Sequence, residues 1–286
     1  VFIIEPKRDS LTGNIGFTGE AFRQPNRVPH PSHLLSGIQI VAEQEGVHVL
    51  LLNSAPNLEW AKVDGLFLCE PDAATVLRSA PETMPCVSLL MPLPNISSVV
   101  ADDYEGSRAA ALHLLNLGHQ RIAYLQTDAR AQVRPRLQGY RAALREAGIK
   151  PQPEWINELT DLPDGLGNLQ RGHRIMAQWL KSDWEKLGCT ALLVQNDEAA
   201  IGAIEALWQA GIHVPEQVSV IGFDGTELCD YCSPRLTTVQ VPLSDIGAAA
   251  AKVLLEQINT GNSEPQFIVL PTTLREGEST APPPSR

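Results

Sequence analysis

The sequence of 286 residues lacks the marks of a membrane protein or of an exported protein. No apolar run reaches the roughly 18 residues of a membrane-spanning helix, and no basic segment followed by an apolar stretch opens the chain. The five cysteines are scattered and odd in number, which is typical of reduced thiols in a cytoplasm. We therefore expect a cytoplasmic protein without a membrane partner. The first residue is Val1 rather than methionine, so a longer natural chain is compatible with the sequence.

Catalytic and metal-binding motifs are missing as well. The sequence contains no G-x-S-x-G, no H-E-x-x-H and no G-x-x-x-x-G-K-[ST]. Cys229 and Cys232 have C-x-x-C spacing, but a zinc site needs two further ligands and there is no second cysteine pair. We therefore expect no enzyme activity, no catalytic residue, no cofactor and no metal.

Positive charge is also in short supply. Thirty-three acidic residues outnumber 22 lysines and arginines, which gives a net charge of −11. A surface of this sign repels the phosphates of DNA, although charge of this kind also simply keeps a protein in solution. Residues 1–286 by themselves are therefore not expected to bind DNA.

What the sequence does have is an alternation of short apolar runs with segments of helical periodicity. The predicted strands cover residues 14–18, 47–53, 63–68, 86–90, 98–102, 121–126, 191–195, 218–223 and 266–270. The predicted helices cover residues 34–45, 103–117, 139–148, 172–180, 199–208 and 245–259. This alternation predicts an α/β fold with parallel sheets, followed by a loose, proline-rich tail from Ala281.

Residues 191–224 have the pattern of one strand–helix–strand unit. Asn196 follows the first predicted strand and Asp224 follows the second. Parallel strands of an open α/β sheet present their carboxyl ends at one edge, where ligands bind. We therefore expect Asn196 and Asp224 to emerge side by side there.

The stretch from Ala191 to Pro242 closely resembles the effector-binding domain of the lactose-repressor (LacI/GalR) family of transcriptional regulators. The matching motifs are Asn196–Ala203 (NDEAAIGA), Val214–Asp224 (VPEQVSVIGFD) and Ser233–Val239 (SPRLTTV), in the family's order. Further matches are VDG at 63–65, LHLLNLGHQRIA at 112–123 and RLQGY at 136–140. The link between residues 53 and 63 is shorter than the family's, which carries a helix there.

The resemblance implies two Rossmann-like subdomains with parallel sheets, joined by a three-strand hinge in the manner of periplasmic binding proteins. By that analogy residues 1–12 are a lead-in or linker. The N-terminal subdomain covers residues 13–118 plus 242–268, and the C-terminal subdomain covers 119–241 plus 269–280. Residues 281–286 form the loose tail.

The resemblance also implies a ligand site in a cleft between the subdomains. Arg136, Asn196 and Asp224 match family positions that face the effector, and their donors and acceptors suit the hydroxyls of a sugar. Each also has a simpler interpretation, as a surface arginine, a helix cap and a turn residue.

Three further residues are candidates for the same cleft. Asp102 and Asp103 lie where the family commonly has Asp-Asn, and we expect one of them there; the alternative is a helix cap. His30 replaces an aromatic residue of the family's cleft.

The function implied is that of a sensor domain, in which a sugar or similar effector controls DNA binding by a separate domain. That domain is either a helix-turn-helix or a winged-helix head, and the resemblance implies a homodimer. An exported sugar-binding protein of a transporter is the alternative, and an enzyme on the same fold is a further one.

Overall fold

The computed structural model describes residues 11–18, 31–52, 60–69, 77–78, 80–81, 83–127, 134–157, 162–163, 165–182, 184–262 and 264–285. The chain divides into two compact units. Unit 1 comprises the chain up to Ala101 together with Pro242–Leu270. Unit 2 comprises Asp102–Val241 together with Pro271–Arg286, so the chain passes from one unit to the other three times.

Unit 1 is built on a six-stranded sheet in the order β10-β5-β4-β3-β1-β2, in which every neighbouring pair is parallel. Its strands are β1 (Asn14–Thr18), β2 (His48–Leu52), β3 (Gly65–Leu68), β4 (Cys86–Leu89), β5 (Ser97–Ala101) and β10 (Phe267–Leu270). The inner strands β3 and β4 are buried along their whole length, as their apolar sequences require. A short 3-10 turn, η3 (Trp60–Lys62), precedes β3.

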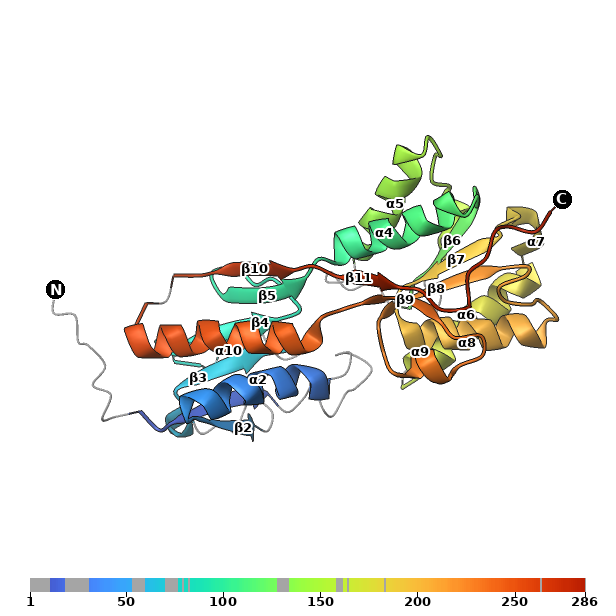
Figure 1. Ribbon diagram of the computed structural model, residues 1–286. Coiled ribbons are helices and arrows are strands. Elements are labelled where there is room, and N and C mark those ends of the chain that lie inside the picture. The colour runs from blue at the N-terminus through green and yellow to red at the C-terminus, as the bar shows by residue number, and fades with distance from the viewer. Residues whose placement is uncertain are drawn as a thin grey trace. The chain divides into compact units, whose positions relative to one another are not determined.

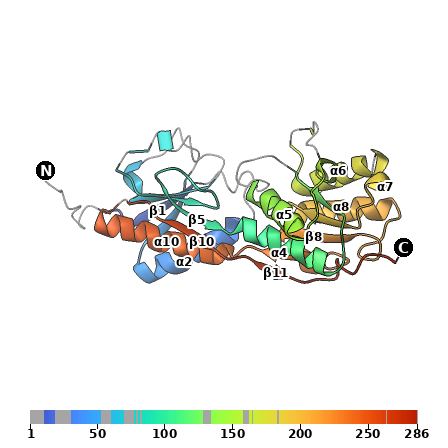
Figure 2. The ribbon, with the colours of Figure 1, turned by 90° about the horizontal axis from the view of Figure 1, so that it is seen from above.

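Two helices of unit 1, α2 (Pro31–Glu45) and α10 (Leu243–Thr260), pack side by side against the sheet (Figures 1 and 2). Their backbones come close because glycine lies at the contact on each helix. A Cβ atom on Gly37 would overlap the carbonyl of Ser244, and one on Gly247 would overlap the carbonyl of Leu34. Close helix packing is therefore a central source of order in unit 1.

Unit 2 is built on a five-stranded sheet in the order β11-β9-β8-β7-β6. Its strands are β6 (Ile122–Leu125), β7 (Ala191–Val194), β8 (Ser219–Asp224), β9 (Thr237–Gln240) and β11 (Thr273–Arg275). The first four are parallel, and β11 joins β9 antiparallel at the sheet edge. The carboxyl ends of β6, β7 and β8 consequently meet at one edge of the sheet.

Helix pairs cover the sheet of unit 2. One pair is α4 (Asp103–Asn116) with α5 (Arg134–Glu146), and the other is α6 (Asn168–Ser182) with α8 (Asp197–Gln209); Figure 1 shows them on opposite faces. Glycine again permits the close contact, since a Cβ on Gly172 would overlap the carbonyl of Ala199. The described residues of the unit also include three short helical segments: η5 (Pro153–Trp155), α7 (Trp184–Leu187) and α9 (Leu228–Tyr231).

The predicted α/β class with parallel sheets is confirmed, and so is the central unit, which the structure builds as β7, α8 and β8. Several helices begin a few residues earlier than predicted, and for the site the start of α5 matters most. Helix α5 starts at Arg134 rather than near residue 139, because Pro135 is compatible with the first turn of a helix. This difference places Arg136 inside the helix.

The border between the units also differs from the prediction. Residues 102–118 were expected in the first subdomain, but the structure groups them with unit 2. The reason is packing: α4 lies along α5 and contacts β9 and β11, and Gly139 of α5 is pressed against the carbonyl of Tyr104. The first crossing between the units therefore falls at Ala101.

The tail predicted to be loose is attached at its first residue. The backbone N–H of Ala281 donates to Ser219 Oγ at 3.0 Å, and its carbonyl oxygen lies 2.8 Å from Nε2 of the buried His119. The tail is therefore ordered at Ala281, which lies against the first residue of β8. His30 and residues 53–59 lie outside the described residues, so the predictions made for them stay predictions.

Candidate functional site

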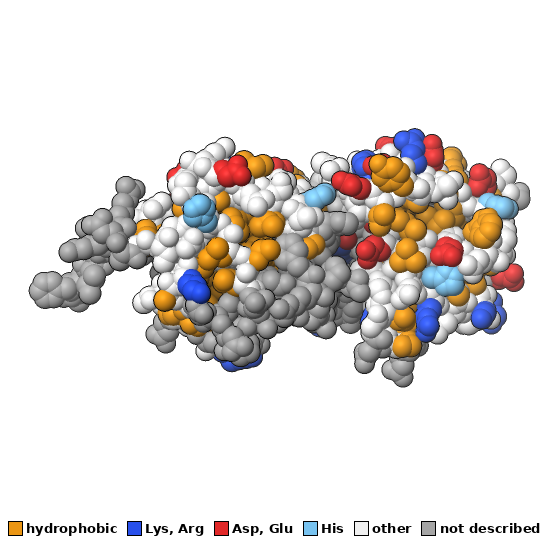
Figure 3. Space-filling view, turned by 90° about the horizontal axis from the view of Figure 1, so that it is seen from below, with side chains coloured by type: hydrophobic (Ala, Val, Ile, Leu, Met, Phe, Trp, Pro, Cys, Tyr) orange, Lys and Arg blue, Asp and Glu red, His pale blue; other side chains and the backbone are white. Residues whose placement is uncertain are grey.

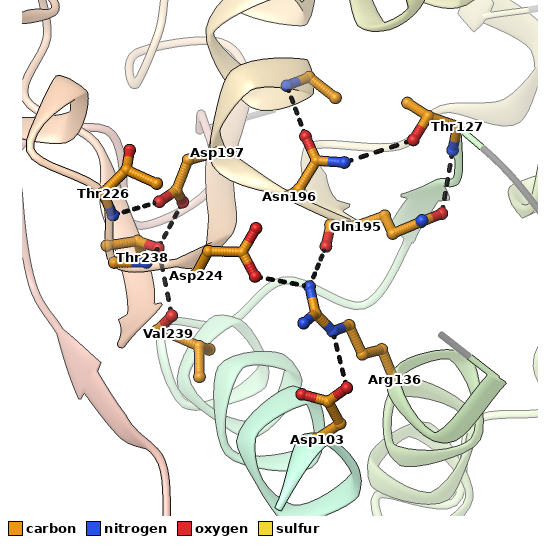
Figure 4. A network of polar contacts seen from close by, with 12 residues as sticks. Asp103, Thr127, Arg136, Gln195, Asn196, Asp197, Asp224, Thr226, Thr238 and Val239 are labelled. Atoms are coloured by element: carbon orange, nitrogen blue, oxygen red, sulfur yellow. Dashed lines mark hydrogen bonds and ion pairs between the residues drawn. The ribbon is translucent and has the colours of Figure 1, made fainter. Parts of the chain in front are cut away.

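The candidate site lies wholly within unit 2, where β6, β7 and β8 end (Figure 4). Polar residues lie at the carboxyl end of each strand. They are Gln126 and Thr127 after β6, Gln195 and Asn196 after β7, and Asp224 as the last residue of β8. The first turns of α4 and α5 add Asp103 and Arg136 to this edge.

Arg136 is the centre of the cluster. Its side chain is only 10% exposed, and Nη1 donates to the carbonyl of Gln195 at 2.7 Å. Two carboxylates flank the guanidinium: Asp224 Oδ1 lies 3.0 Å from Nη1, and Asp103 Oδ2 lies 3.2 Å from Nε. The guanidinium carbon also lies 3.8 Å from the ring centroid of Phe223, which is a cation–π contact.

The ion pairs of Arg136 are close but poorly aligned. Asp103 Oδ1, Asp224 Oδ1 and Arg136 Nε are buried atoms without an aligned hydrogen bond among the described residues. Buried polar atoms in folded proteins are nearly always hydrogen-bonded, so such atoms mark a place where a further partner fits. Two acceptors and one donor of this cluster are therefore left without an aligned partner by the described protein atoms.

Burial governs the charges of the cluster. It raises the pKa of Asp224 to about 7, although the positive charge of Arg136 acts in the opposite direction. Burial likewise raises the pKa of Asp103, again opposed by Arg136. Burial disfavours the charge on Arg136, but the two carboxylates outweigh it and raise the pKa of the guanidinium. Arg136 thus stays protonated, and its positive charge favours ionisation of the two carboxylates, which burial opposes.

Asn196 caps helix α8 and is tied to the neighbouring strand end. Its Oδ1 accepts from the backbone N–H of Ala199 at 2.9 Å, and its Nδ2 donates to Thr127 Oγ1 at 3.3 Å. Thr127 is held in turn by Gln195, whose Oε1 accepts from the Thr127 N–H at 3.0 Å. The Nδ2 atom of Asn196 carries two hydrogens, and one of them is donated to Thr127.

Asp197, the next residue, is completely buried and is not among the site residues predicted from the sequence. Its Oδ2 accepts from the backbone N–H of Thr226 at 2.7 Å, and its Oδ1 accepts from the hydroxyl of Thr238. Burial raises the pKa of Asp197, and these hydrogen bonds oppose the rise. The only sequence signal for this residue is its place beside Asn196 after a buried strand.

The predicted site residues separate into groups. Arg136, Asp224 and Asp103 form one cluster, and Asn196 lies beside it on the next strand end (Figure 4). Asp102 points elsewhere: its Oδ1 accepts from the N–H of Glu105 at 3.0 Å, as the N-cap of α4. His30 is outside the described residues.

Other chemistry has no comparable support. Among the described residues, no three His, Cys, Asp or Glu side chains are placed to hold a metal ion. Cys229 and Cys232 are free thiols, and burial raises the pKa of Cys229 to about 12, which keeps it unreactive. The described helices include none that is long and apolar enough to span a bilayer.

Two parallel-sheet units joined by three crossings, with a polar cluster at the strand ends of one unit, define a periplasmic-binding-protein-like ligand-binding chain. The family model of the periplasmic binding protein-like domain matches residues 111–280. The transcriptional repressor PurR of Vibrio vulnificus is 30% identical over 79% of this chain and 70% of its own length. The chain belongs to the LacI family of transcriptional regulators.

Solved structures agree with this assignment. A LacI-family regulator from Enterococcus faecium with bound ribose is 28% identical and matches with a TM-score of 0.77, over 94% of this chain and 99% of its own. The regulator CelR in complex with cellobiose matches with a TM-score of 0.80 at 25% identity, over 94% of this chain and 85% of its own. The chain is therefore the effector-sensing part of a regulator, and these relatives do not favour a transport function.

Proposed function

We propose that the chain senses an uncharged molecule with several hydroxyl groups, of the sugar class, through Asp103, Arg136, Asn196 and Asp224. The observation that carries this proposal is the buried guanidinium of Arg136 between two carboxylates, with unaligned polar atoms on all three residues. A sugar hydroxyl both donates and accepts, so one ligand can satisfy Asp224 Oδ1 and Arg136 Nε together. Ribose and cellobiose in the two solved relatives support this class of effector.

The charge of the cluster favours a neutral effector. Two carboxylates face one guanidinium, and the pKa of Asp224 is already raised to about 7 by burial. An added phosphate or carboxylate would bring a third negative charge next to the carboxylates of Asp103 and Asp224, which share the guanidinium of Arg136. A hydroxyl-rich neutral molecule adds no such repulsion.

Calorimetric titration with D-ribose, cellobiose and ribose 5-phosphate tests the proposal. We expect one of the neutral sugars to bind and ribose 5-phosphate to bind more weakly. Asp103→Asn and Asp224→Asn keep the side-chain shape but replace an acceptor by a donor, so each should weaken binding roughly tenfold to a hundredfold. Arg145→Ala, an exposed position on the same helix as Arg136, is the matched control and should bind like wild type.

The proposal is wrong if both Asn variants bind the sugar as tightly as the Arg145→Ala control. It is also wrong if the phosphorylated sugar is preferred, because the charge argument would then have the wrong sign.

The regulatory output is proposed to run through a DNA-binding part outside this chain, in a cytoplasmic homodimer. The net charge of −11 disfavours DNA contact by the chain itself. On the face seen in Figure 3, Lys and Arg side chains are scattered among Asp and Glu instead of forming a basic patch. Gel-shift assays should find no salt-sensitive DNA binding by residues 1–286. Sedimentation at micromolar concentration should find dimers, and a monomer would contradict the proposed homodimer.

A further inference from the structure

Asp224 has an unusual backbone. Its φ angle is +115°, in a region that residues other than glycine rarely adopt, and it occurs at the last residue of β8. Such a conformation persists only where surrounding contacts enforce it. The contacts that enforce it therefore decide where the Asp224 carboxylate points.

Part of the restraint is the neighbouring strand β9. Asp224 is in register with Gln240, and its carbonyl accepts from the N–H of Val241 at 3.1 Å. These bonds fix the backbone up to Asp224 but not the two residues after it, where the chain turns away from the sheet.

The following two residues are held by side chains instead. The N–H of Gly225 donates to Thr238 Oγ1 at 3.3 Å, and the N–H of Thr226 donates to Asp197 Oδ2 at 2.7 Å. The Thr238 hydroxyl donates to the other oxygen of Asp197, so one carboxylate joins both restraints (Figure 4). Asp197 thus holds the turn from α8, while Thr238 holds it from β9.

The surroundings of Asp197 leave its carboxylate no room for a further partner. It is 0% exposed, and a Cβ on Gly222 of β8 would overlap its Oδ1. Both of its oxygens are used by the turn or by the residue that supports the turn. It therefore does not offer an oxygen to a ligand and can influence binding only through Asp224.

We propose that Asp197, with Thr238, is a positioning residue that keeps Asp224 in its left-handed conformation and its carboxylate against Arg136. The proposal rests on the proposed function for its consequence, which is sugar binding by Asp224. Its geometric part stands independently, because it concerns the ligand-free protein.

Crystal structures of ligand-free Asp197→Ala and Thr238→Val test the geometry. We expect the φ angle of Asp224 to leave the positive region, and its carboxylate to move beyond the roughly 4 Å limit of an ion pair with Arg136. Asp197→Asn should preserve the position of Asp224, because an amide oxygen still accepts from the Thr226 N–H. An Asp224 that stays at +115° and 3.0 Å from Arg136 Nη1 in both of the first two variants would overturn the proposal.

Titration of the same variants with D-ribose and cellobiose tests the consequence. Asp197→Ala and Thr238→Val should bind the wild-type sugar at least tenfold more weakly, and Asp197→Asn should bind like wild type. The control is Thr237→Val, which removes an equally buried hydroxyl from the same strand; that hydroxyl contacts Gly277 and Thr280 and not the turn. An equal loss in the control would mean that only general stability matters, which would overturn the proposal.

A double substitution separates this proposal from the proposed function. In the Asp224→Ala background, removing Asp197 should cause no further loss of affinity, since its effect passes through Asp224. If wild type binds neither sugar, or Asp224→Ala binds normally, the proposed function fails and the crystal structures alone decide the role of Asp197. If Asp224→Ala loses binding while Asp197→Ala and Thr238→Val retain it, the positioning role fails and the proposed function stands.

Discussion

The two units share a design but differ in what they bury. Both place glycines where helices pack, and both have wholly buried inner strands. Among the described residues, the buried polar side chains of unit 1 are neutral: Ser88, Ser97, Ser98 and Gln257. Unit 2 buries Arg136, Asp197 and Asp224 in addition to neutral groups.

This difference separates what makes the fold from what makes the site. Apolar strands and close helix contacts suffice for a parallel α/β unit, as unit 1 demonstrates. Buried charges cost free energy unless they are paired, so their presence at the strand ends of unit 2 calls for another reason than folding. For Arg136 and Asp224 the reason that we propose is ligand recognition, and for Asp197 it is the support of the turn after β8.

The largest expected effect is the loss of stability on replacing Arg136. Arg136→Ala leaves Asp103 and Asp224 buried near each other without a cation, which should cost about 3–5 kcal/mol of unfolding free energy at pH 8. Urea denaturation measures this, with Arg145→Ala as the control on the same helix. If Arg136→Ala and Arg145→Ala lose the same small amount of unfolding free energy, buried charges do not distinguish unit 2 from unit 1 as described.

A smaller loss of stability, equal in the two units, should follow from replacing the glycines at the helix contacts. Gly37→Ala in unit 1 and Gly172→Ala in unit 2 each force a methyl group into a neighbouring backbone carbonyl. Overpacking of this kind costs about 1–3 kcal/mol, which exceeds the roughly 0.5–1 kcal/mol that alanine gains over glycine in a helix. Ser36→Ala, at an exposed position beside Gly37, is the control and should not destabilise. Thermal unfolding of the variants measures this loss of stability. If only one of the two glycine substitutions is destabilising, the two units do not depend on close helix packing in the same way.

The pH dependence should follow the buried carboxylates of unit 2. Burial raises the pKa of Asp224 to about 7, whereas an unfolded aspartate has a pKa of about 4. Between these values the folded state binds more protons than the unfolded state, so stability falls as pH rises, by up to about 1.4 kcal/mol per pH unit. Below about pH 4 both states are protonated and above about pH 7 both are ionised, so the slope vanishes there.

Urea denaturation at pH 5, 6 and 8 measures this slope, and Asp224→Asn is the reference because it cannot titrate. The variant should show a shallower decline with pH than wild type. Parallel curves for the two proteins would place the titrating group elsewhere.

The smallest effect is expected at an exposed counterpart of the buried cluster. Arg108 also bridges two carboxylates, with 2.9 Å contacts to Glu105 and Glu146, but both glutamates are well exposed and Arg108 is 29% exposed. Water and salt screen such pairs, so Arg108→Ala should leave the unfolding free energy unchanged within error. A loss like that of Arg136→Ala would show that burial is not the deciding factor.

Much of the fold could be predicted from the sequence because buried parallel strands read as apolar runs. Strands β7 and β8 were recognised on this basis, whereas β9 and β11 were not among the predicted strands. Thr237–Gln240 is short and polar in composition, and Thr273–Arg275 becomes a strand only by pairing with it. Such pairing is a tertiary effect that local sequence does not contain.

The site could be predicted in its residue types but not in its connections. Strand-end placement and family resemblance pointed to Arg136, Asn196 and Asp224. The choice between Asp102 and Asp103 stayed open, because adjacent residues at a strand-to-helix turn point in different directions. The role of Asp197 was missed, since its partners Thr226 and Thr238 lie 29 and 41 positions away in the sequence.

The most direct test of the account is a crystal structure of the chain with the sugar that it binds. The account predicts sugar hydroxyls within about 2.7–3.2 Å of Asp224 and of Arg136, with Asp103 contacting the same ligand. A bound sugar without a hydrogen bond to any of these three residues would contradict it.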